Sequence, residues 1–511
     1  MSAVSEPASF IGKLFRTTSI DVLRDEAKRP SQLRKVLRAR DLVAIGLGSM
    51  IGGGIFTTIG PGVKQAGPAI IISFVLAGLA SFFAALCYAE LGAMVPIAGS
   101  AYTYAYATLG QVVAWIIGFS LLFEYGISAA PVAQQFSGAF RTLLSSLGIN
   151  VPKWAQTSHF VFHGAWWDVS RWDFGASQYD VIGALFVLAL SILLSLGIRE
   201  TAATNNLFVV LKILALVVFV AFGLQLFHAQ NLTPFMPFGW GSLKPFSGAA
   251  GGIGNGIIPA AALVFFSYIG FDAATTTAEE CRRPQRDIPV GVMGALGVGT
   301  VIYCVVAVVL VGIVPWQKID ENAALAAAVA PLHNPFVNWS ITIGVLAGTT
   351  SVALSSLLGQ TRIFYVMARD RMLPPGVAHI DARTKTPVRM TMITGVAIAC
   401  LTLIVPLDIL LNLVNIGTLL AFTIVCAGVL YLRRSRPDLR RPFKVPLVPL
   451  FPVLGILSCS FLAIFGLDQL TWKSFGISLL VGLVLYFAYG FRHSAPEQLA
   501  MIPPELEEIK V

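Results

Sequence analysis

The stretch Ser49-Met50-Ile51-Gly52-Gly53-Gly54-Ile55-Phe56 places three consecutive glycines inside the first long apolar segment of this 511-residue chain. Glycine is a poor residue for the interior of a helix, so we expect a membrane helix to break here. Backbone groups freed inside a bilayer are tolerated only where protein buries them or where they line a water-filled cavity. The break therefore predicts a place where a polar ligand is held.

The composition on both sides of this break indicates an all-α integral membrane protein. Hydrophobic residues make up 56% of the chain and charged residues 12%, and the charged share is about half that of a soluble domain. Apolar segments and turn signals give about twelve spans of roughly 20 residues, the length that crosses a hydrocarbon layer of about 30 Å. The spans are expected near residues 41–63, 69–94, 111–137, 179–197, 206–227, 253–273, 289–315, 337–362, 390–406, 409–432, 446–466 and 474–491.

Basic residues assign a side of the membrane to the two termini. Twelve spans place both termini on one side, and most of the 35 lysine and arginine residues fall in segments on that side. The positive-inside rule predicts that this side is the cytoplasm. We therefore expect a plasma (inner) membrane protein with cytoplasmic termini. Its net charge of +9 reflects this topology and contact with the lipid bilayer, so nucleic acid is not an expected partner.

Cysteine and histidine patterns argue against a disulfide framework and a metal site. The six cysteines lie in spans or near the cytoplasmic side without a C-x-x-C pair, and the six histidines lie in loops or near span ends without clustering. The spans contain no histidine, and we find no nucleophile beside a base. Neither enzyme activity nor a metal or organic cofactor is expected.

A second interrupted span falls at residues 253–273. The sequence Phe265-Phe266-Ser267-Tyr268-Ile269-Gly270-Phe271-Asp272 places Gly270 and Asp272 late in an otherwise apolar helix. A single glycine in a membrane helix is commonly a packing contact. Breaks in spans 1 and 6, however, occupy corresponding positions if spans 1–5 and 6–10 form an inverted pair, which favours a transport site.

Ordered motifs support this interpretation. Span 1 carries Gly-Ser-Met-Ile-Gly-Gly-Gly-Ile-Phe, span 2 leads from Cys87-Tyr88-Ala89-Glu90-Leu91 into residues 96–102, and span 6 carries residues 268–272. These motifs resemble those of the amino acid, polyamine and organocation (APC) transporter superfamily. Residues 278–280, 283–289, 359–362 and 369–370 are similar to its cationic amino acid transporter branch, including bacterial members. The resemblance covers roughly residues 33–492.

The resemblance implies a five-plus-five inverted repeat with discontinuous helices 1 and 6 and two extra C-terminal helices. It divides the chain into a cytoplasmic segment 1–40, a first repeat 41–227, a second repeat 253–432, two further helices 446–491 and a cytoplasmic tail 492–511. The longest outer segment, residues 138–178, is expected to cap the outer mouth.

A broken helix suits an amino acid, whose carboxylate needs donors and whose ammonium needs acceptors. The carboxylate is expected at the start of the second half of span 1, where a half-helix dipole favours an anion, on the amides of Gly52, Gly53 and Gly54. The resemblance places the carbonyls that accept from the ammonium at Met50, Phe266 and Ile269. It also implies that the Phe266 ring covers the substrate, whereas spacing alone leaves a packing role open.

Ionisable residues within the spans are costly in hydrocarbon and count as functional candidates. Glu90 and Asp272 fall toward cytoplasmic ends, where contacts with a basic surface suffice, so we expect structural roles for them. Lys212 lies well inside span 5, where burial disfavours its charged form. The resemblance implies that Lys212 replaces a sodium ion and couples transport to a proton. A structural cation joining span 5 to span 1 or 8, or an ion pair with Glu124, are the alternatives.

Side chains in spans 3 and 8 complete the expected site. Glu124, near the middle of span 3, is expected to hold a cationic substrate side chain; proton coupling and pairing with Lys212 stay open. Ser356 is expected near the substrate side chain, although span 8 hydroxyls also act as interhelical contacts.

The expected function is proton-coupled uptake of an amino acid, with preference for cationic ones, by alternating access. Uptake of small neutral amino acids, sodium-coupled transport, exchange, a channel and a nutrient receptor are the alternatives. Lys212 argues against sodium-coupled transport, because its ammonium group and a sodium ion would compete for one site. The expected partners are the amino acid and the bilayer; whether a small accessory subunit binds is unknown.

Overall fold

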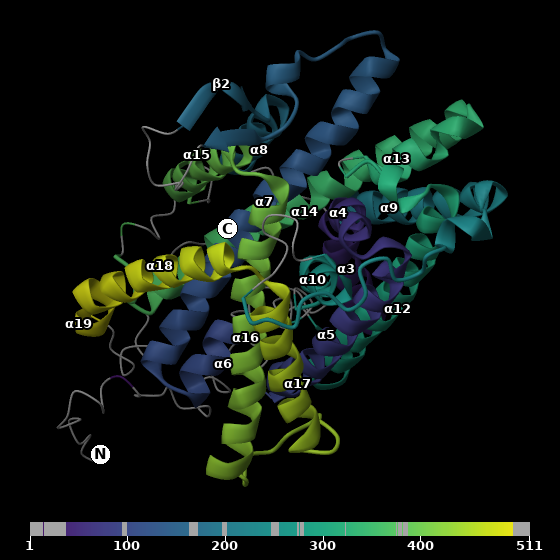
Figure 1. Cartoon of the computed structure of the whole chain (residues 1–511). Coiled ribbons are helices and arrows are strands. Elements are labelled where there is room, and N and C mark those ends of the chain that lie inside the picture. The colour runs from purple at the N-terminus through teal and green to yellow at the C-terminus, as the bar shows by residue number, and fades with distance from the viewer. Residues whose placement is uncertain are drawn as a thin grey trace, which may run out of the picture.

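The computed structural model describes residues 37–94, 100–162, 172–196, 202–246, 255–272, 281–321, 323–374 and 387–493, together with residues 14, 275, 376 and 381. Most of these residues are helical, and the helices form one bundle (Figure 1). Most of the predicted N-terminal segment, the tail from residue 494 and the motif at 278–280 lie outside the described residues.

Helices cover all twelve predicted spans. In chain order they are α3 (Ala39–Gly53) with α4 (Ile55–Ala66), α5 (Ile70–Met94), α7 (Gln111–Ser146), α8 (Val181–Ser195), α9 (Ala202–Gly223), α10 (Ile257–Val264) with η7 (Phe265–Tyr268), α12 (Pro284–Ile313), α14 (Pro335–Arg369), α15 (Val388–Ile404), α16 (Leu407–Ser435), α17 (Leu450–Phe461) and α18 (Gln469–Leu485). Shorter helices include α6 (Ser100–Thr108), α13 (Ala324–Val329) and α19 (Phe491–His493). Among the described residues, 7 helices are long and apolar enough to cross a membrane.

The outer segment contains a feature that an all-α prediction did not include. Strands β1 (His159–Phe162) and β2 (Trp172–Gln178) pair antiparallel on the predicted outer side, beside the outer end of α7 (Figure 1). Helix α7 also continues to Ser146, so the segment after it is shorter than predicted. Residues 163–171, between the strands, lie outside the described residues.

The most extensive helix contacts agree with an inverted repeat, in which spans 1 to 5 correspond to spans 6 to 10 and each contact between two spans recurs between their counterparts. The contact between α3 and α12 (spans 1 and 7) has its counterpart in α10 and α5 (spans 6 and 2). The contact between α7 and α16 (spans 3 and 10) has its counterpart in α14 and α9 (spans 8 and 5). The pairs α7–α14 and α8–α15 map onto themselves. The molecule therefore has the five-plus-five arrangement, with α17 and α18 added.

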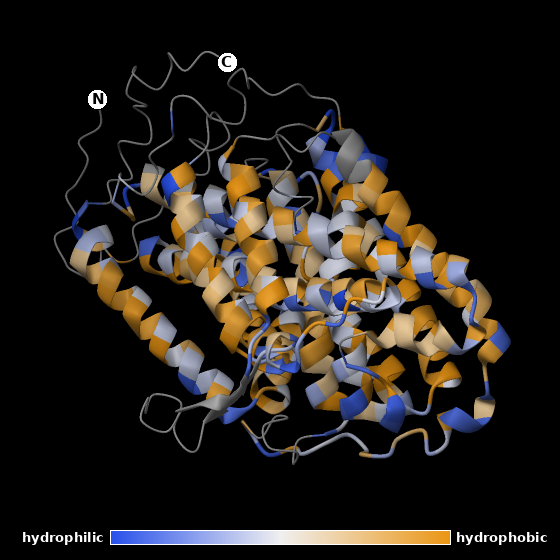
Figure 2. Ribbon diagram, turned by 90° about the horizontal axis from the view of Figure 1, so that it is seen from above, coloured by the Kyte–Doolittle hydropathy of each residue, from blue (hydrophilic) through white to orange (hydrophobic). Residues whose placement is uncertain are grey.

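Hydrophobic residues predominate along the helices, while hydrophilic residues gather at helix ends and in the connections (Figure 2). Large apolar side chains are exposed along several spans, among them Leu79, Val210, Val217, Val301 and Leu480. Such a surface would be unfavourable in water but matches the acyl chains of a bilayer. The polar candidates Glu124, Lys212 and Asp272 are instead buried within the protein.

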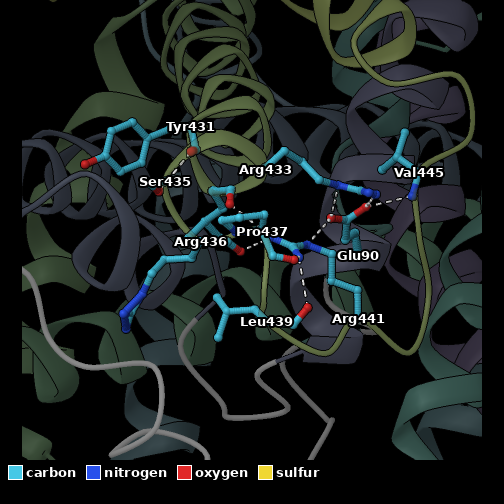
Figure 3. A network of polar contacts seen from close by, with 10 residues as sticks. Glu90, Tyr431, Arg433, Ser435, Arg436, Pro437, Leu439, Arg441 and Val445 are labelled. Carbon is cyan, nitrogen blue, oxygen red and sulfur yellow. Dashed lines mark hydrogen bonds and ion pairs between the residues drawn. The ribbon is translucent and has the colours of Figure 1, made fainter.

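A buried ion-pair cluster joins α5 to the predicted cytoplasmic end of α16 (Figure 3). Glu90, which is 2% exposed, accepts from Arg433 Nε over 3.0 Å and from Arg433 Nη2 over 2.6 Å. Arg441 Nε lies 3.4 Å from Glu90 Oε1, and the Val445 amide donates to Oε2 over 2.7 Å. These contacts support the structural role that we expected for Glu90.

Candidate functional site

The first span is discontinuous at the glycine triplet, as predicted. Helix α3 ends at Gly53 and α4 begins at Ile55. Ile51 leaves the helical region with φ −76° and ψ 44°, and Gly54 joins the two helices with φ −72° and ψ −89°. The Gly54 amide donates to the Met50 carbonyl over 3.1 Å. The break is therefore a sharp bend with one connecting residue.

The triplet lies about two residues earlier relative to the break than we predicted. Gly52 and Gly53 close α3, and Gly54 is the N-cap of α4, because the backbone departs from helical geometry already at Ile51. The positive end of the α4 dipole is therefore at Ile55 and Phe56. A carboxylate at this break would therefore lie near the amides of Ile55 and Phe56, since the Gly54 amide already donates to the Met50 carbonyl.

Close helix approach explains the small residues at the bend. A Cβ atom on Gly53 would lie 2.7 Å from Val352 Cγ1 and 2.9 Å from Val132 Cγ2. A Cβ atom on Gly52 would overlap the Gly348 carbonyl of α14. Helices α7 and α14 thus converge on the bend, and the two valines form apolar walls beside it.

The second break follows η7, where span 6 leaves the helix. Ile269 is extended, with φ −64° and ψ 134°, and Gly270 has φ +110°, a conformation that glycine adopts readily. A Cβ atom on Gly270 would lie 2.8 Å from Ser49 Cβ, and Thr58 and Ser267 share a hydrogen bond of 2.6 Å. The two breaks therefore cross in direct contact.

The predicted ammonium acceptors surround this crossing. The Met50 carbonyl accepts from Gly54, and the Phe266 carbonyl accepts from the Ile269 amide over 3.2 Å. A carbonyl oxygen has a second lone pair, so these bonds leave room for another donor. Phe266 is buried, and its ring edge lies 3.6 Å from the position of a Cβ on Gly53. The ring therefore stands beside the bend, and its covering role stays a prediction.

Lys212 connects three spans. Its side chain is fully buried, and Nζ donates to the Gly48 carbonyl, just before the bend, and to Ser351 Oγ over 3.0 Å. Ser351 Oγ in turn donates to the Gly348 carbonyl over 3.0 Å. These contacts join span 5 to spans 1 and 8. Glu124 lies elsewhere, near Asp272 and Thr418.

Polar residues of α7 and α14 face each other in pairs beside the bend, at two heights along the helices. Ser128 Oγ donates to Ser356 Oγ over 3.0 Å. In the predicted topology the two spans run in opposite directions, so the residues one turn further toward the cytoplasm are Glu124 and Gln360, at one level. A Cβ atom on Gly126 would overlap the Gln360 amide, which agrees with this pairing.

Two buried acceptor atoms at the Glu124 level lack hydrogen-bond partners among the described residues. Glu124 is 2% exposed and its Oε2 is unpaired, and Gln360 is 7% exposed with its Oε1 unpaired. Burying unpaired acceptors costs roughly 1–3 kcal/mol each, more for a charged group. A ligand that donates hydrogen bonds would remove this cost.

Gln360, Val132 and Val352 lie at the candidate site but were not among the residues that we predicted from the sequence. Gln360 lay in a motif that we used only for the family resemblance. A signal was present, because Glu124 and Ser128 are four residues apart on one helix and Ser356 and Gln360 are four apart on the other. The facing of the two pairs depends on which helices are neighbours.

Hydrogen bonds on the predicted cytoplasmic side link helices of both repeats. The Tyr102 hydroxyl of α6 donates to Asp370 Oδ2 over 2.8 Å, at the end of α14. The Tyr125 hydroxyl of α7 donates to Asp272 Oδ2 over 3.1 Å. The second bond supports the structural role that we expected for Asp272.

Comparisons with known proteins agree with this arrangement. A family model described as amino acid permease matches residues 37–487. The chain is 39% identical to the branched-chain amino acid permease BcaP of Bacillus subtilis, covering 95% of this chain and 100% of the relative. It is 36% identical to the methylthioribose transporter of the same organism (95% and 99%) and 35% identical to the vacuolar cationic amino acid transporter 4 of Arabidopsis thaliana (82% and 66%).

Proposed function

Because the chain belongs to the amino acid permease family, within the APC superfamily, we propose that it imports an amino acid together with a proton and prefers cationic amino acids. The α-carboxylate and α-ammonium bind at the crossing of the two breaks, where backbone groups supply donors and acceptors. The two repeats then move relative to each other around the bound substrate. No covalent step is involved.

The observation that carries the cationic preference is the pair of unpaired acceptors at Glu124 and Gln360. An ammonium or guanidinium group offers donors only, so it complements both atoms directly or through water. The Glu124 level lies eight residues, or about 12 Å, cytoplasmic of Val132 along α7. A long side chain that extends from the bend toward the cytoplasm approaches this level, whereas a short branched one ends beside the valines and serines.

The second candidate function is uptake of neutral branched-chain amino acids. Val132 and Val352 stand beside the bend and would contact a short apolar side chain. One relative is named as a branched-chain amino acid permease and another as a cationic amino acid transporter. The two candidate functions assign different roles to Glu124, so substitution of Glu124 can distinguish them.

Lys212 supports proton coupling. A buried ammonium held by neutral oxygens in span 1 and span 8 stabilises one arrangement of these helices, and loss of its proton weakens both bonds. The location in the plasma membrane and the cytoplasmic termini are also part of this proposal. They rest on the distribution of basic residues.

The test is uptake into proteoliposomes, with arginine, lysine, leucine and alanine at two external pH values. We expect saturable accumulation of arginine and lysine that increases in acid. Glu124→Gln should weaken arginine binding by about tenfold or more, because a charge-assisted contact contributes about 1.5–3 kcal/mol.

Alanine uptake by the same Glu124→Gln variant is the matched control, since alanine does not reach Glu124. Equal loss for arginine and alanine would contradict the role of Glu124. Accumulation of leucine but not arginine by the unchanged protein would select the branched-chain candidate. Binding without accumulation of any amino acid would select a receptor.

A further inference from the structure

The segment that leads from the end of α16 toward α17 concentrates positive charge on the predicted cytoplasmic side. Residues 433–444 contain six basic residues and one acidic residue, Asp438. Arg433 and Arg441 turn inward to Glu90, whose carboxylate neutralises part of this charge. The other four cations are exposed, and they are Arg434, Arg436, Arg440 and Lys444.

The buried cluster around Glu90 fixes the backbone of this segment. Arg441 is buried, and its Nη2 donates to the Leu432 carbonyl over 3.0 Å and to the Arg436 carbonyl over 2.8 Å. The Val445 amide donates to Glu90 (Figure 3). These bonds hold the segment on α16 at one end and on α5 at the other. The exposed cations therefore extend from a constrained backbone.

Three of the exposed cations are open to an anionic ligand. The side chains of Arg434, Arg436 and Lys444 make no hydrogen bond or ion pair with another residue of the described chain. Figure 3 shows the Arg436 side chain extending away from Glu90. Phosphate oxygens accept charge-assisted hydrogen bonds from guanidinium and ammonium groups. The segment thus presents donors of the kind that bind a phosphate group.

Exposed side chains that face lipid border these cations. Tyr431 is 50% exposed and precedes Arg434 by three residues, so the two share one face of α16. Leu447 and Leu450, where α17 begins, are 65% and 50% exposed. Tyrosine is enriched at membrane interfaces, and exposed leucines at a span end contact acyl chains. The cations are therefore placed at the level of the lipid headgroups.

We propose that this segment binds the headgroup of an anionic phospholipid from the predicted cytoplasmic leaflet. Arg434, Arg436 and Lys444 bind its phosphate, and its acyl chains lie against Leu447 and Leu450. A zwitterionic phospholipid also carries a phosphate, but its choline group would bring a positive charge to the same cations. The site therefore selects lipids of net negative charge. This inference does not depend on which solute the protein transports.

Soluble anions fit the segment less well. Inorganic phosphate or an acidic protein would use the same donors from the aqueous side. Neither would gain from the apolar surface beside them, and Arg434 lies on the face of α16 that Tyr431 directs to the bilayer. A lipid uses both the cations and the apolar surface.

The test is lipid retention by the purified full-length protein, measured by native mass spectrometry with equal amounts of phosphatidylglycerol and phosphatidylcholine in detergent. We expect the unchanged protein to retain phosphatidylglycerol preferentially, and increasing salt to weaken this retention. The triple variant Arg434→Gln, Arg436→Gln, Lys444→Gln should bind phosphatidylglycerol about a hundredfold more weakly. Each cation near an anionic membrane surface contributes about fivefold to the affinity.

The matched control is the triple variant Arg282→Gln, Arg283→Gln, Arg286→Gln. It removes three exposed cations from another segment on the same predicted side, and it should keep the preference for phosphatidylglycerol. Equal loss in both triple variants would overturn the proposal, because it would indicate a general effect of net charge. Equal retention of the two lipids by the unchanged protein would also overturn it, as would displacement of phosphatidylglycerol by inorganic phosphate at the same concentration.

Thermal unfolding provides a second readout. Added phosphatidylglycerol should raise the Tm of the unchanged protein and of the control variant, because a ligand that binds only the folded state stabilises it. The variant of Arg434, Arg436 and Lys444 should unfold at the same Tm as the unchanged protein in phosphatidylcholine, and phosphatidylglycerol should leave this Tm unchanged. An equal rise of Tm in all three proteins would contradict a lipid site at this segment.

Discussion

At the scale of single residues, the decisive feature is a small set of polar atoms that the protein buries in the bilayer. Lys212 is satisfied by two oxygen atoms from other spans, whereas Glu124 and Gln360 retain unpaired acceptors. A buried polar atom with partners stabilises the fold, and one without partners costs free energy unless a ligand completes it. This difference distinguishes Lys212, the candidate for proton coupling, from Glu124 and Gln360, the candidate substrate contacts.

Lys212→Ala should impair acid-stimulated uptake more than it impairs folding. The substitution removes the group that we propose gains and loses a proton, and the Gly48 carbonyl and Ser351 lose their bonds to Lys212 Nζ. The measurement is the ratio of uptake at acidic and neutral external pH, which should fall close to one. Ser355→Ala is a control, because Ser355 Oγ donates within its own helix to the Ser351 carbonyl. A normal pH ratio in Lys212→Ala would exclude Lys212 as the coupling residue.

At the scale of elements, contacts far apart in the chain hold the spans in place. Glu90 of α5 binds Arg433 at the end of α16 and Arg441 in the following loop. All three side chains lie at the predicted cytoplasmic face. The side chains of Glu90 and Arg441 are nearly inaccessible, at 2% and 4%. Breaking such a pair leaves an uncompensated buried charge.

Glu90→Gln should therefore destabilise the protein by about 3 kcal/mol, the loss expected when one partner of a buried pair is removed. Thermal unfolding in detergent measures this as a lower Tm. Asp41→Asn is the matched control, because Asp41 is partly exposed and its ion pair with Arg40 spans 3.6 Å. A Tm equal to that of the unchanged protein would show that the cluster does not stabilise α5 against α16.

At the scale of the whole molecule, the structure is asymmetric across the predicted membrane. A cavity of about 620 Å³ lies on the predicted outer side, while Tyr102 with Asp370 and Tyr125 with Asp272 join the helices on the predicted cytoplasmic side. The alternating access that we propose requires the contacts on the predicted cytoplasmic side to open when the outer cavity closes. We therefore expect the hydrogen bonds on that side to contribute to the balance between the two proposed states.

Tyr102→Phe should shift this balance toward the state that is open to the cytoplasm. It removes one hydroxyl and its bond to Asp370, and about 1 kcal/mol corresponds to roughly a fivefold change in the ratio of states. A thiol reagent applied from the cytoplasmic side, acting on a cysteine introduced at Ser128, should react faster in this variant. Tyr431→Phe, on an exposed side chain, is the control. Equal labelling rates would contradict a gating role for Tyr102.

Much of the architecture could be predicted because its signals are local. Long apolar runs fix where spans lie, and the triplet at residues 52–54 and Gly270 fix where they break, since backbone hydrogen bonding in lipid permits breaks only at protected places. All twelve predicted spans have helices, and both breaks are present. The break was predicted about two residues from its observed position because the backbone leaves helical geometry at Ile51, a residue type that gives no sequence signal for a break.

The sequence by itself determined the membrane class, the order of the spans, the two breaks and the ionisable residues whose burial requires an explanation. Only the tertiary structure decided the partners. Lys212 binds atoms more than 100 residues away, Glu124 comes level with Gln360, and Arg141 and Asp180 line one outer cavity. The physical reason is that hydropathy and glycine act within one helix, whereas these contacts depend on which helices are neighbours and at what height they meet.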